Sequence, residues 1–204
     1  MVFTWIKPRT RRVYRTPLTP HQLWMVSLSA PVRVGRDASR TTLHPFTRVD
    51  EDKARRRLVE QWETGSRDEL IVRLGALARS GFRGQARARL GVEPLAWDIA
   101  LYADMVRCGF AAGLIPEADA WNLLKNVVPR VAGTYDTWQE YGAHYLLGLG
   151  VWREGVRGTP SEALLPAQDV AEAHVAALLD PANRRSPWRR APLDVIRRPD
   201  RRPE

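Results

Sequence analysis

Cysteine and long apolar runs are scarce in this chain of 204 residues. The single cysteine, Cys108, cannot form a disulfide within the chain and cannot build a multi-thiolate metal site. No apolar stretch approaches the roughly 20 residues that a membrane-spanning helix needs, and residues 1–8 lack the apolar core of a signal peptide. We therefore expect a cytoplasmic protein with no membrane span, no bound metal and no cofactor.

The motifs of common enzyme classes are absent as well. The sequence has no phosphate-binding GxxxxGK(S/T), no GxGxxG after a strand, no GxSxG nucleophile turn and no HExxH zinc motif. These absences remove the sharpest enzymatic hypotheses. The leading hypothesis is a non-enzymatic binding or interaction module whose partner is another protein.

Acidic residues are fewer than basic ones, and the difference lies at the two ends of the chain. The formal net charge is +9. Residues 1–16 hold five basic residues and no acidic one, and residues 184–204 hold eight arginines against three acidic residues. We expect a basic N-terminal extension over 1–16, a helical domain over 17–190 and a basic C-terminal tail over 191–204. Flexible, solvated ends are favoured over ends that bind nucleic acid, which stays an alternative.

Signals for helix starts, in contrast, are abundant. A Ser or Thr followed three residues later by Glu or Gln forms a reciprocal capping box, and four such pairs begin at Thr19, Ser66, Thr137 and Thr159. Apolar residues at spacings of three and four follow most helix starts, and no strand pattern extends beyond a few residues. The sequence predicts an all-α fold, a single irregular helical domain of about six to eight helices.

The remaining segments are predicted from missing periodicity and from the positions of glycine and proline. Residues 31–49 lack periodicity and are expected to form a loop, and small and basic residues alternate from Arg83 to Gly91 before Pro94 restarts the chain. Gly148 lies inside a predicted helix, where glycine costs about 1 kcal/mol relative to alanine. We expect this glycine to permit the close approach of a neighbouring helix.

The stretch 94–153 carries several motifs that occur together in one family. They are Trp97-Asp98-Ile99-Ala100, Cys108-Gly109-Phe110-Ala111-Ala112-Gly113, Ala120-Trp121, and Tyr145-Leu146-Leu147-Gly148 with Trp152. With these motifs the chain resembles a bacterial family catalogued as domain of unknown function 1266, to whose ending Ser186-Pro187-Trp188 is also similar. The resemblance implies helices and a bacterial origin, and it supplies no activity or catalytic residues.

Five residues in this stretch are candidates for ligand binding: Asp98, Tyr102, Trp121, Tyr145 and Trp152. The aromatic residues could frame a pocket for a flat ligand or a peptide side chain, or they could form the core. Asp98 borders the apolar stripe of its helix, with Tyr102 one turn later, so a buried carboxylate would need a partner. Because the Tyr145 hydroxyl and the Trp152 indole also need partners when buried, we expect a polar cluster that joins them to Asp98.

The second hypothesis is a small enzyme that uses Asp98 or the pair Glu140 and His144. The pair is spaced by four residues, so a carboxylate and an imidazole would share one helix face and could exchange a proton. An exposed helical pair without a catalytic role is the simpler interpretation. Cys108 is expected to pack rather than react, because the C-terminal end of a helix disfavours a thiolate.

Overall fold

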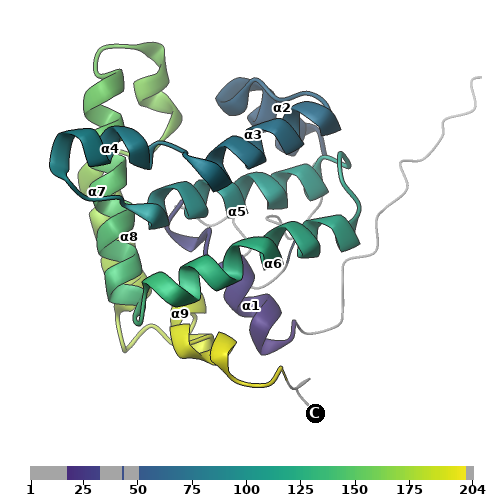
Figure 1. Cartoon of the computed structure of the whole chain (residues 1–204), viewed down its shortest axis with the longest axis vertical. Coiled ribbons are helices and arrows are strands. Elements are labelled where there is room, and N and C mark those ends of the chain that lie inside the picture. The colour runs from purple at the N-terminus through teal and green to yellow at the C-terminus, as the bar shows by residue number, and fades with distance from the viewer. Residues whose placement is uncertain (1–17, 33–42, 44–50, 201–204) are drawn as a thin grey trace, which may run out of the picture.

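The computed structural model describes residues 18–32, 43 and 51–200, and helices are the only regular elements in this part of the chain. Eight of the α-helices have eight residues or more, so the predicted all-α domain is confirmed (Figure 1). In chain order the elements are α1 (Pro20–Ser27), 3₁₀-helix η1 (Ala30–Val32), α2 (Glu51–Trp62), α3 (Arg67–Arg79), α4 (Arg83–Leu90), α5 (Leu95–Ala111), α6 (Glu117–Thr134), α7 (Trp138–Val156), η2 (Pro160–Leu164), α8 (Gln168–Leu179), α9 (Pro187–Arg190) and η3 (Leu193–Arg197).

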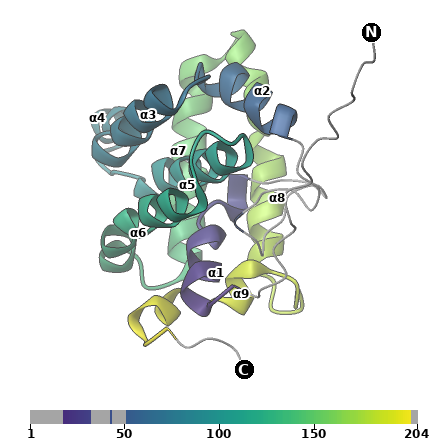
Figure 2. The same cartoon turned by 90° about the vertical axis from the view of Figure 1, so that its right-hand side faces the viewer.

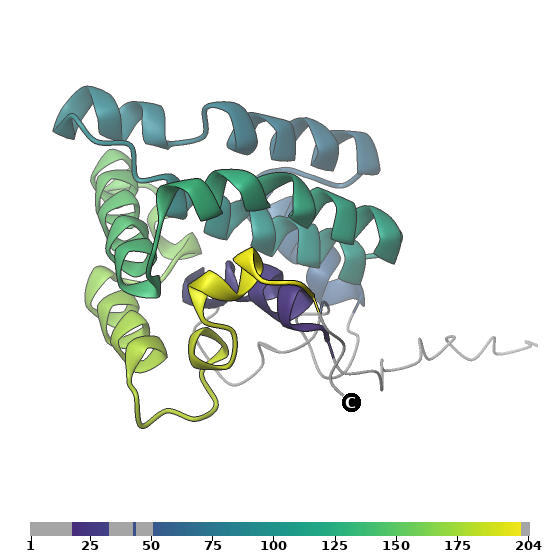
Figure 3. The same cartoon turned by 60° about the horizontal axis from the view of Figure 1, so that its bottom comes forward.

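Helix α5 forms the centre of the molecule, and every one of its residues is buried. It packs against α2, α3, α6 and α7, and Figure 3 shows α3 and α4 above it and α1 below it. Its sequence explains this position, because Asp98, Asp104 and Arg107 are its only charged residues. Although α5 is fully buried, no described helix combines the length and apolarity that crossing a bilayer requires.

Three of the four predicted capping boxes form as expected. At Thr19, Ser66 and Thr137 the side chain accepts a hydrogen bond from the third helical residue, whose own side chain accepts from the cap backbone. These boxes fix the starts of α1, α3 and α7. Thus the strongest local signals in the sequence correctly placed three of the helices.

The fourth predicted box, at Thr159, is wrong. Its hydroxyl donates to the Val156 carbonyl instead of capping the next turn, and the segment forms only the short η2. Glu162 still reaches back, where it accepts from the Gly158 N–H at 2.9 Å and pairs with Arg153 at 3.3 Å. With the hydroxyl turned toward α7, one half of the reciprocal pair is missing and no α-helix begins here.

Helix α4 was not predicted. Only Arg83 and Ala86 are buried in it, so its apolar pattern is too weak to indicate a helix. The sequence predicted a loop over 31–49. The 3₁₀-helix Ala30–Val32 overlaps the beginning of this range, and Leu43 within it is buried. The rest of that loop lies outside the described residues.

The predicted close approach at Gly148 is confirmed. A Cβ atom at this position would overlap the Cβ of Trp97, which lies on α5. Helices α5 and α7 pack together along this line, as their extensive contact indicates. The missing side chain therefore allows α7 to lie directly on the central helix.

The folded body extends further toward the C-terminus than the predicted boundary at 190. Element η3 packs against α1 and α6, and Figure 2 shows α1 and α9 close together at the bottom of the molecule. The Trp24 indole donates to the Leu193 carbonyl at 3.0 Å, and Asp200 accepts from the Thr19 hydroxyl at 2.8 Å. Residues 191–200 thus belong to the packed structure, whereas 1–16 and 201–204 lie outside the described residues.

Candidate functional site

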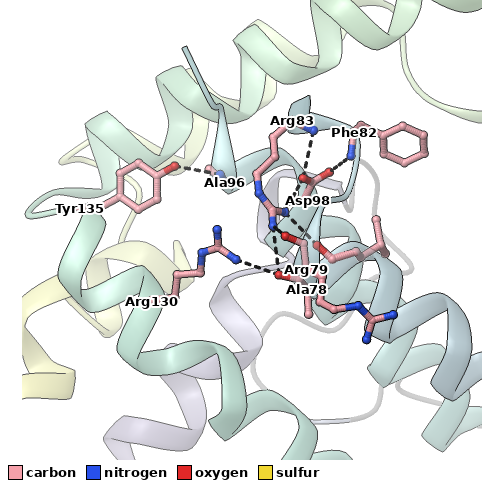
Figure 4. A network of polar contacts seen from close by, with 9 residues as sticks. Ala78, Arg79, Phe82, Arg83, Ala96, Asp98, Arg130 and Tyr135 are labelled. Atoms are coloured by element: carbon pink, nitrogen blue, oxygen red, sulfur yellow. Dashed lines mark hydrogen bonds and ion pairs between the residues drawn. The ribbon is translucent and has the colours of Figure 1, made fainter. Parts of the chain in front are cut away.

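Asp98 holds the turn between α3 and α4 from its position on the central helix. Its carboxylate accepts from the Phe82 N–H at 2.7 Å, the Arg83 N–H at 3.2 Å and the Arg83 Nη1 at 2.8 Å (Figure 4). The side chains of Asp98 and Arg83 are 0% and 3% exposed. Asp98 therefore caps the start of α4 from another helix, and the partner that a buried carboxylate needs lies outside α5.

Arg83 uses the rest of its guanidinium to close the end of α3. Nη1 donates to the Leu77 carbonyl at 2.9 Å, Nη2 donates to the Ala78 carbonyl at 3.0 Å, and Nη2 also reaches the Arg79 carbonyl. Gly81 lies in the left-handed region with φ +52°, and a Cβ there would overlap the Asp98 carboxylate. Only glycine fits this turn, so the chain path from α3 to α4 is firmly fixed.

The expected polar cluster of Asp98 with Tyr145 and Trp152 is wrong. The Asp98 oxygens are bonded to Phe82 and Arg83 instead, because the start of α4 offers backbone donors at this side of α5. Burial raises the pKa of the Asp98 carboxyl, and the hydrogen bonds from Phe82 and Arg83 offset part of that rise. An enclosed carboxylate with these partners is poorly placed to meet a substrate.

The other candidates from the sequence lie in different surroundings. The Tyr102 hydroxyl donates to the Leu123 carbonyl at 2.9 Å, and the Trp121 indole donates to Glu117 at 3.0 Å. Tyr145 is fully buried against Trp97, with ring centroids 5.4 Å apart, and its hydroxyl has no hydrogen-bond partner in the described structure. These three side chains belong to the packed interior, and the structure does not bring them together around one pocket.

The residues Glu140 and His144 do not converge either. Glu140 accepts from the backbone N–H groups of Asp136 and Thr137 as part of its capping box. His144 instead pairs its Nδ1 with the Tyr135 hydroxyl at 3.1 Å. In the part of the chain that the structure describes, no three His, Cys, Asp or Glu residues are grouped so that they could hold a metal ion.

One cleft of about 400 Å³ opens between α2–α3 on one side and α7–η2 on the other. Trp152, a candidate from the sequence, borders this cleft together with two other partly exposed aromatic side chains, Trp62 and Phe82. Leu77 and Leu101 form its buried floor. We call it the aromatic cleft, and its full lining is Glu60, Gln61, Trp62, Glu63, Arg73, Ala76, Leu77, Ser80, Gly81, Phe82, Leu101, Trp152, Val156, Ser161 and Leu165.

Neighbouring contacts fix the backbone of Phe82 and the ring of Trp152. The backbone of Phe82 is bonded to Asp98, so the network of Figure 4 also sets one wall of the cleft. Trp152 packs against Trp97, with ring centroids 6.1 Å apart, and it forms the opposite wall. The cleft is therefore built on rigid helical elements rather than on a long loop.

The mouth of the cleft carries charge. The Glu63 side chain is 90% exposed and lies 3.6 Å from Arg73, and Glu60 is exposed beside them. A second hollow of about 280 Å³ adjoins the cleft and shares Glu63, Arg73 and Ala76 with it. Its lining includes Val72, which is 71% exposed, and we call the two hollows together the groove.

The fold and the groove define an all-helical protein with a cleft bordered by partly exposed aromatic side chains. The chain belongs to the family described as Protein of unknown function (DUF1266), whose model matches residues 34–193. The resemblance found in the sequence is thus confirmed, and the matched range includes every residue that lines the groove. The chain matches no curated protein and no solved structure.

Proposed function

We propose that the protein is a non-enzymatic interaction module that holds a peptide segment of a partner protein in the groove. The observation that carries the proposal is the grouping of Trp62, Phe82 and Trp152, which come from three separate elements and stay partly exposed around one cleft. A volume of about 400 Å³ lies in the range of ligand-binding clefts. Partly exposed aromatic side chains are typical of protein interfaces because they combine large apolar area with few rotatable bonds.

The length of the groove favours a peptide over a compact small molecule. The two hollows share lining residues, so an occupant of the aromatic cleft can continue over Ala76 toward Val72. Val72 is largely exposed, and an apolar side chain of this kind gains from being covered by a partner. A peptide can place successive side chains in both hollows.

The surroundings of the candidate catalytic groups support binding over catalysis. Asp98 is enclosed by Arg83, and Glu140 is engaged in its capping box. General acids and bases must reach the proton that they transfer, which these side chains do not do here. At the C-terminal end, Arg197 is paired with Asp136 at 2.7 Å, so part of the basic charge proposed for nucleic-acid binding serves the fold.

Selection from a random peptide display library tests the proposal. The wild-type protein is expected to enrich peptides with a shared apolar motif, and a variant with a blocked groove should lose their binding. Ala76→Trp is the blocking variant, because Ala76 is exposed on α3 and lines both hollows. Gln85→Trp, on the exposed face of α4 and outside the groove, is the matched control.

The enriched peptides should bind wild type and Gln85→Trp equally, and bind Ala76→Trp at least about tenfold more weakly, the loss expected when an interface residue is obstructed. Circular dichroism confirms that both variants are folded. Failure to enrich any peptide, or equal binding by Ala76→Trp, would refute the proposal.

A further inference from the structure

We infer that the peptide presents an arginine or lysine side chain, and that Glu63 and Glu60 hold its cationic group beside Trp62 at the mouth of the aromatic cleft. This inference rests on the proposed function, because it names the chemistry of the occupant of the same groove. Three independent features of the groove support it: the sign of its charge, the backbone of Glu63 and the neighbouring indole ring.

The groove is negatively charged on a chain that is positive overall. Its lining has three carboxylates, Glu60, Glu63 and Glu69, against one guanidinium, Arg73, while the whole chain has a formal net charge of +9. Glu69 is engaged, since it accepts from the backbone N–H groups that precede α3. Arg73 offsets one of the two remaining carboxylates, which leaves a net negative charge at the mouth.

Glu63 has a backbone conformation that glycine would adopt more easily. Its φ is 51°, and it is the one non-glycine residue of the described chain with a positive φ, whereas Gly81, Gly91, Gly113 and Gly158 take up the other such positions. It follows the last residue of α2, where the Thr64 N–H donates to the Leu58 carbonyl at 3.1 Å in the manner of a helix-ending Schellman turn.

The fold makes little use of the carboxylate that occupies this glycine position. The Glu63 side chain is 90% exposed, and its contact with Arg73 at 3.6 Å joins two exposed groups. A residue that strains the backbone and adds little to the fold indicates a use of its side chain outside the fold. Its place at the mouth of the groove makes a bound cation the natural counterpart.

Trp62 supplies the second element of recognition. It directly precedes Glu63, lines the same cleft and is partly exposed. Cations are attracted to the face of an indole ring, and a guanidinium can also stack on it. The methylene groups of an arginine or lysine side chain can cover the apolar lining while the charged end stays at the carboxylates.

The test repeats the library selection with Glu63→Gln, which keeps the backbone strain and removes the charge, and with Glu63→Gly, which removes both. Glu93→Gln, an exposed carboxylate outside the groove, is the matched control. Wild type and Glu93→Gln should enrich peptides with an arginine or lysine at a fixed distance from the apolar motif. Both Glu63 variants should retain the apolar motif and lose the preference for the cation.

Synthetic peptides then measure the effect directly. In an enriched peptide, replacing arginine by citrulline removes the charge at nearly constant shape, and replacing lysine by norleucine removes the ammonium group and keeps the aliphatic chain. This change should weaken binding to wild type about tenfold, the loss expected when a charged group beside an aromatic ring and a carboxylate is removed. It should change the affinity for Glu63→Gln by no more than about twofold.

The outcomes separate the two proposals. Enriched peptides without a cationic residue, or a charge preference that survives in Glu63→Gly, would overturn this inference and leave the proposed function standing. Enrichment of no peptide by the wild-type protein would overturn both.

Discussion

Replacing Asp98 by asparagine should destabilise the protein without changing its fold. The substitution conserves shape, and the asparagine carbonyl oxygen can still accept from the Phe82 N–H. The amide nitrogen would then face the Arg83 N–H and the Arg83 Nη1, two donors that now donate to a carboxylate oxygen at 3.2 and 2.8 Å. Two hydrogen bonds are lost, and the charge of Arg83 loses its counter-ion.

The size of the effect follows from what Arg83 retains. Its guanidinium still donates to the carbonyl groups of Leu77, Ala78 and Arg79, so it is not left without partners. We therefore expect a loss of about 1–3 kcal/mol in the free energy of unfolding for Asp98→Asn, the cost of buried groups with weakened hydrogen bonds. Asp98→Ala removes all three bonds and should cost about 3–5 kcal/mol.

Urea denaturation followed by circular dichroism measures this effect as a shift in the urea concentration at which half of the protein is unfolded. The slope of the free energy of unfolding against urea concentration should stay unchanged, as expected for two-state unfolding. Asp68→Asn, an exposed acidic residue in the first turn of α3, is the control and should change stability by less than about 0.5 kcal/mol. Amide hydrogen exchange should show the greatest loss of protection in α4, whose start Asp98 caps. An Asp98→Asn protein as stable as the Asp68→Asn control would refute this account of the network.

Three further predictions concern other parts of the fold. Gly148→Ala should lower the free energy of unfolding by about 1–3 kcal/mol, because the new methyl group meets Trp97. Gly155→Ala lies on the same helix with open space around it and should raise the free energy of unfolding by about 0.5–1 kcal/mol. Thermal unfolding of the two variants compares these effects. Glu63→Gly should stabilise by about 1 kcal/mol, and unchanged or reduced stability would contradict the argument from its positive φ. Burial raises the pKa of Tyr102 to about 12. The shift in this pKa therefore stabilises the folded state at pH values below the ordinary tyrosine pKa of about 10, and this stabilisation is lost as the pH rises to about 12. In an absorbance titration, Tyr102→Phe should lack one tyrosinate component that the wild-type protein shows in this pH range.

Local chemistry accounts for what the sequence predicted correctly. The capping boxes at Thr19, Ser66 and Thr137 involve residues three apart, so no tertiary information was needed to place these helix starts. Gly148 was likewise informative, because a glycine inside a helix requires an explanation and a close neighbour is the commonest one. The all-α class followed from the repetition of such signals.

The partners of Asp98 could not be predicted, because they depend on the packing of α4 against α5. The alternation of small and basic residues after Arg83 gave no apolar stripe, and Asp98 accepts hydrogen bonds from the two backbone N–H groups at the start of α4. The Asp98 hydrogen bonds join residues that are 16 and 15 positions apart in the chain. A buried acidic residue indicated that a partner existed, and the sequence could not say which one.

The groove was missed for a related reason. Trp62 continues the apolar spacing of Ala54 and Leu58, a pattern typical of a helix face that packs on the core. In the structure it lies at the end of α2, where it packs against the core and also lines the cleft. Phe82 directly follows Gly81, and no sequence pattern indicated that its side chain lines a cleft. The one local signal was Glu63, a glutamate where a glycine commonly ends a helix, and its meaning depends on knowing where α2 stops.

The Asp98 network and the groove are connected through Phe82, and this connection decides how binding data should be interpreted. Phe82 donates its N–H to Asp98 and lines the aromatic cleft, so a loosened network is expected to displace one wall of the cleft. An Asp98 variant that binds peptides more weakly is therefore no evidence that Asp98 contacts them. Loss of a direct contact would alter which peptides are selected, as expected for Glu63. A displaced wall would instead weaken the binding of all selected peptides alike, because a positioning residue changes the affinity and not the chemistry that is recognised.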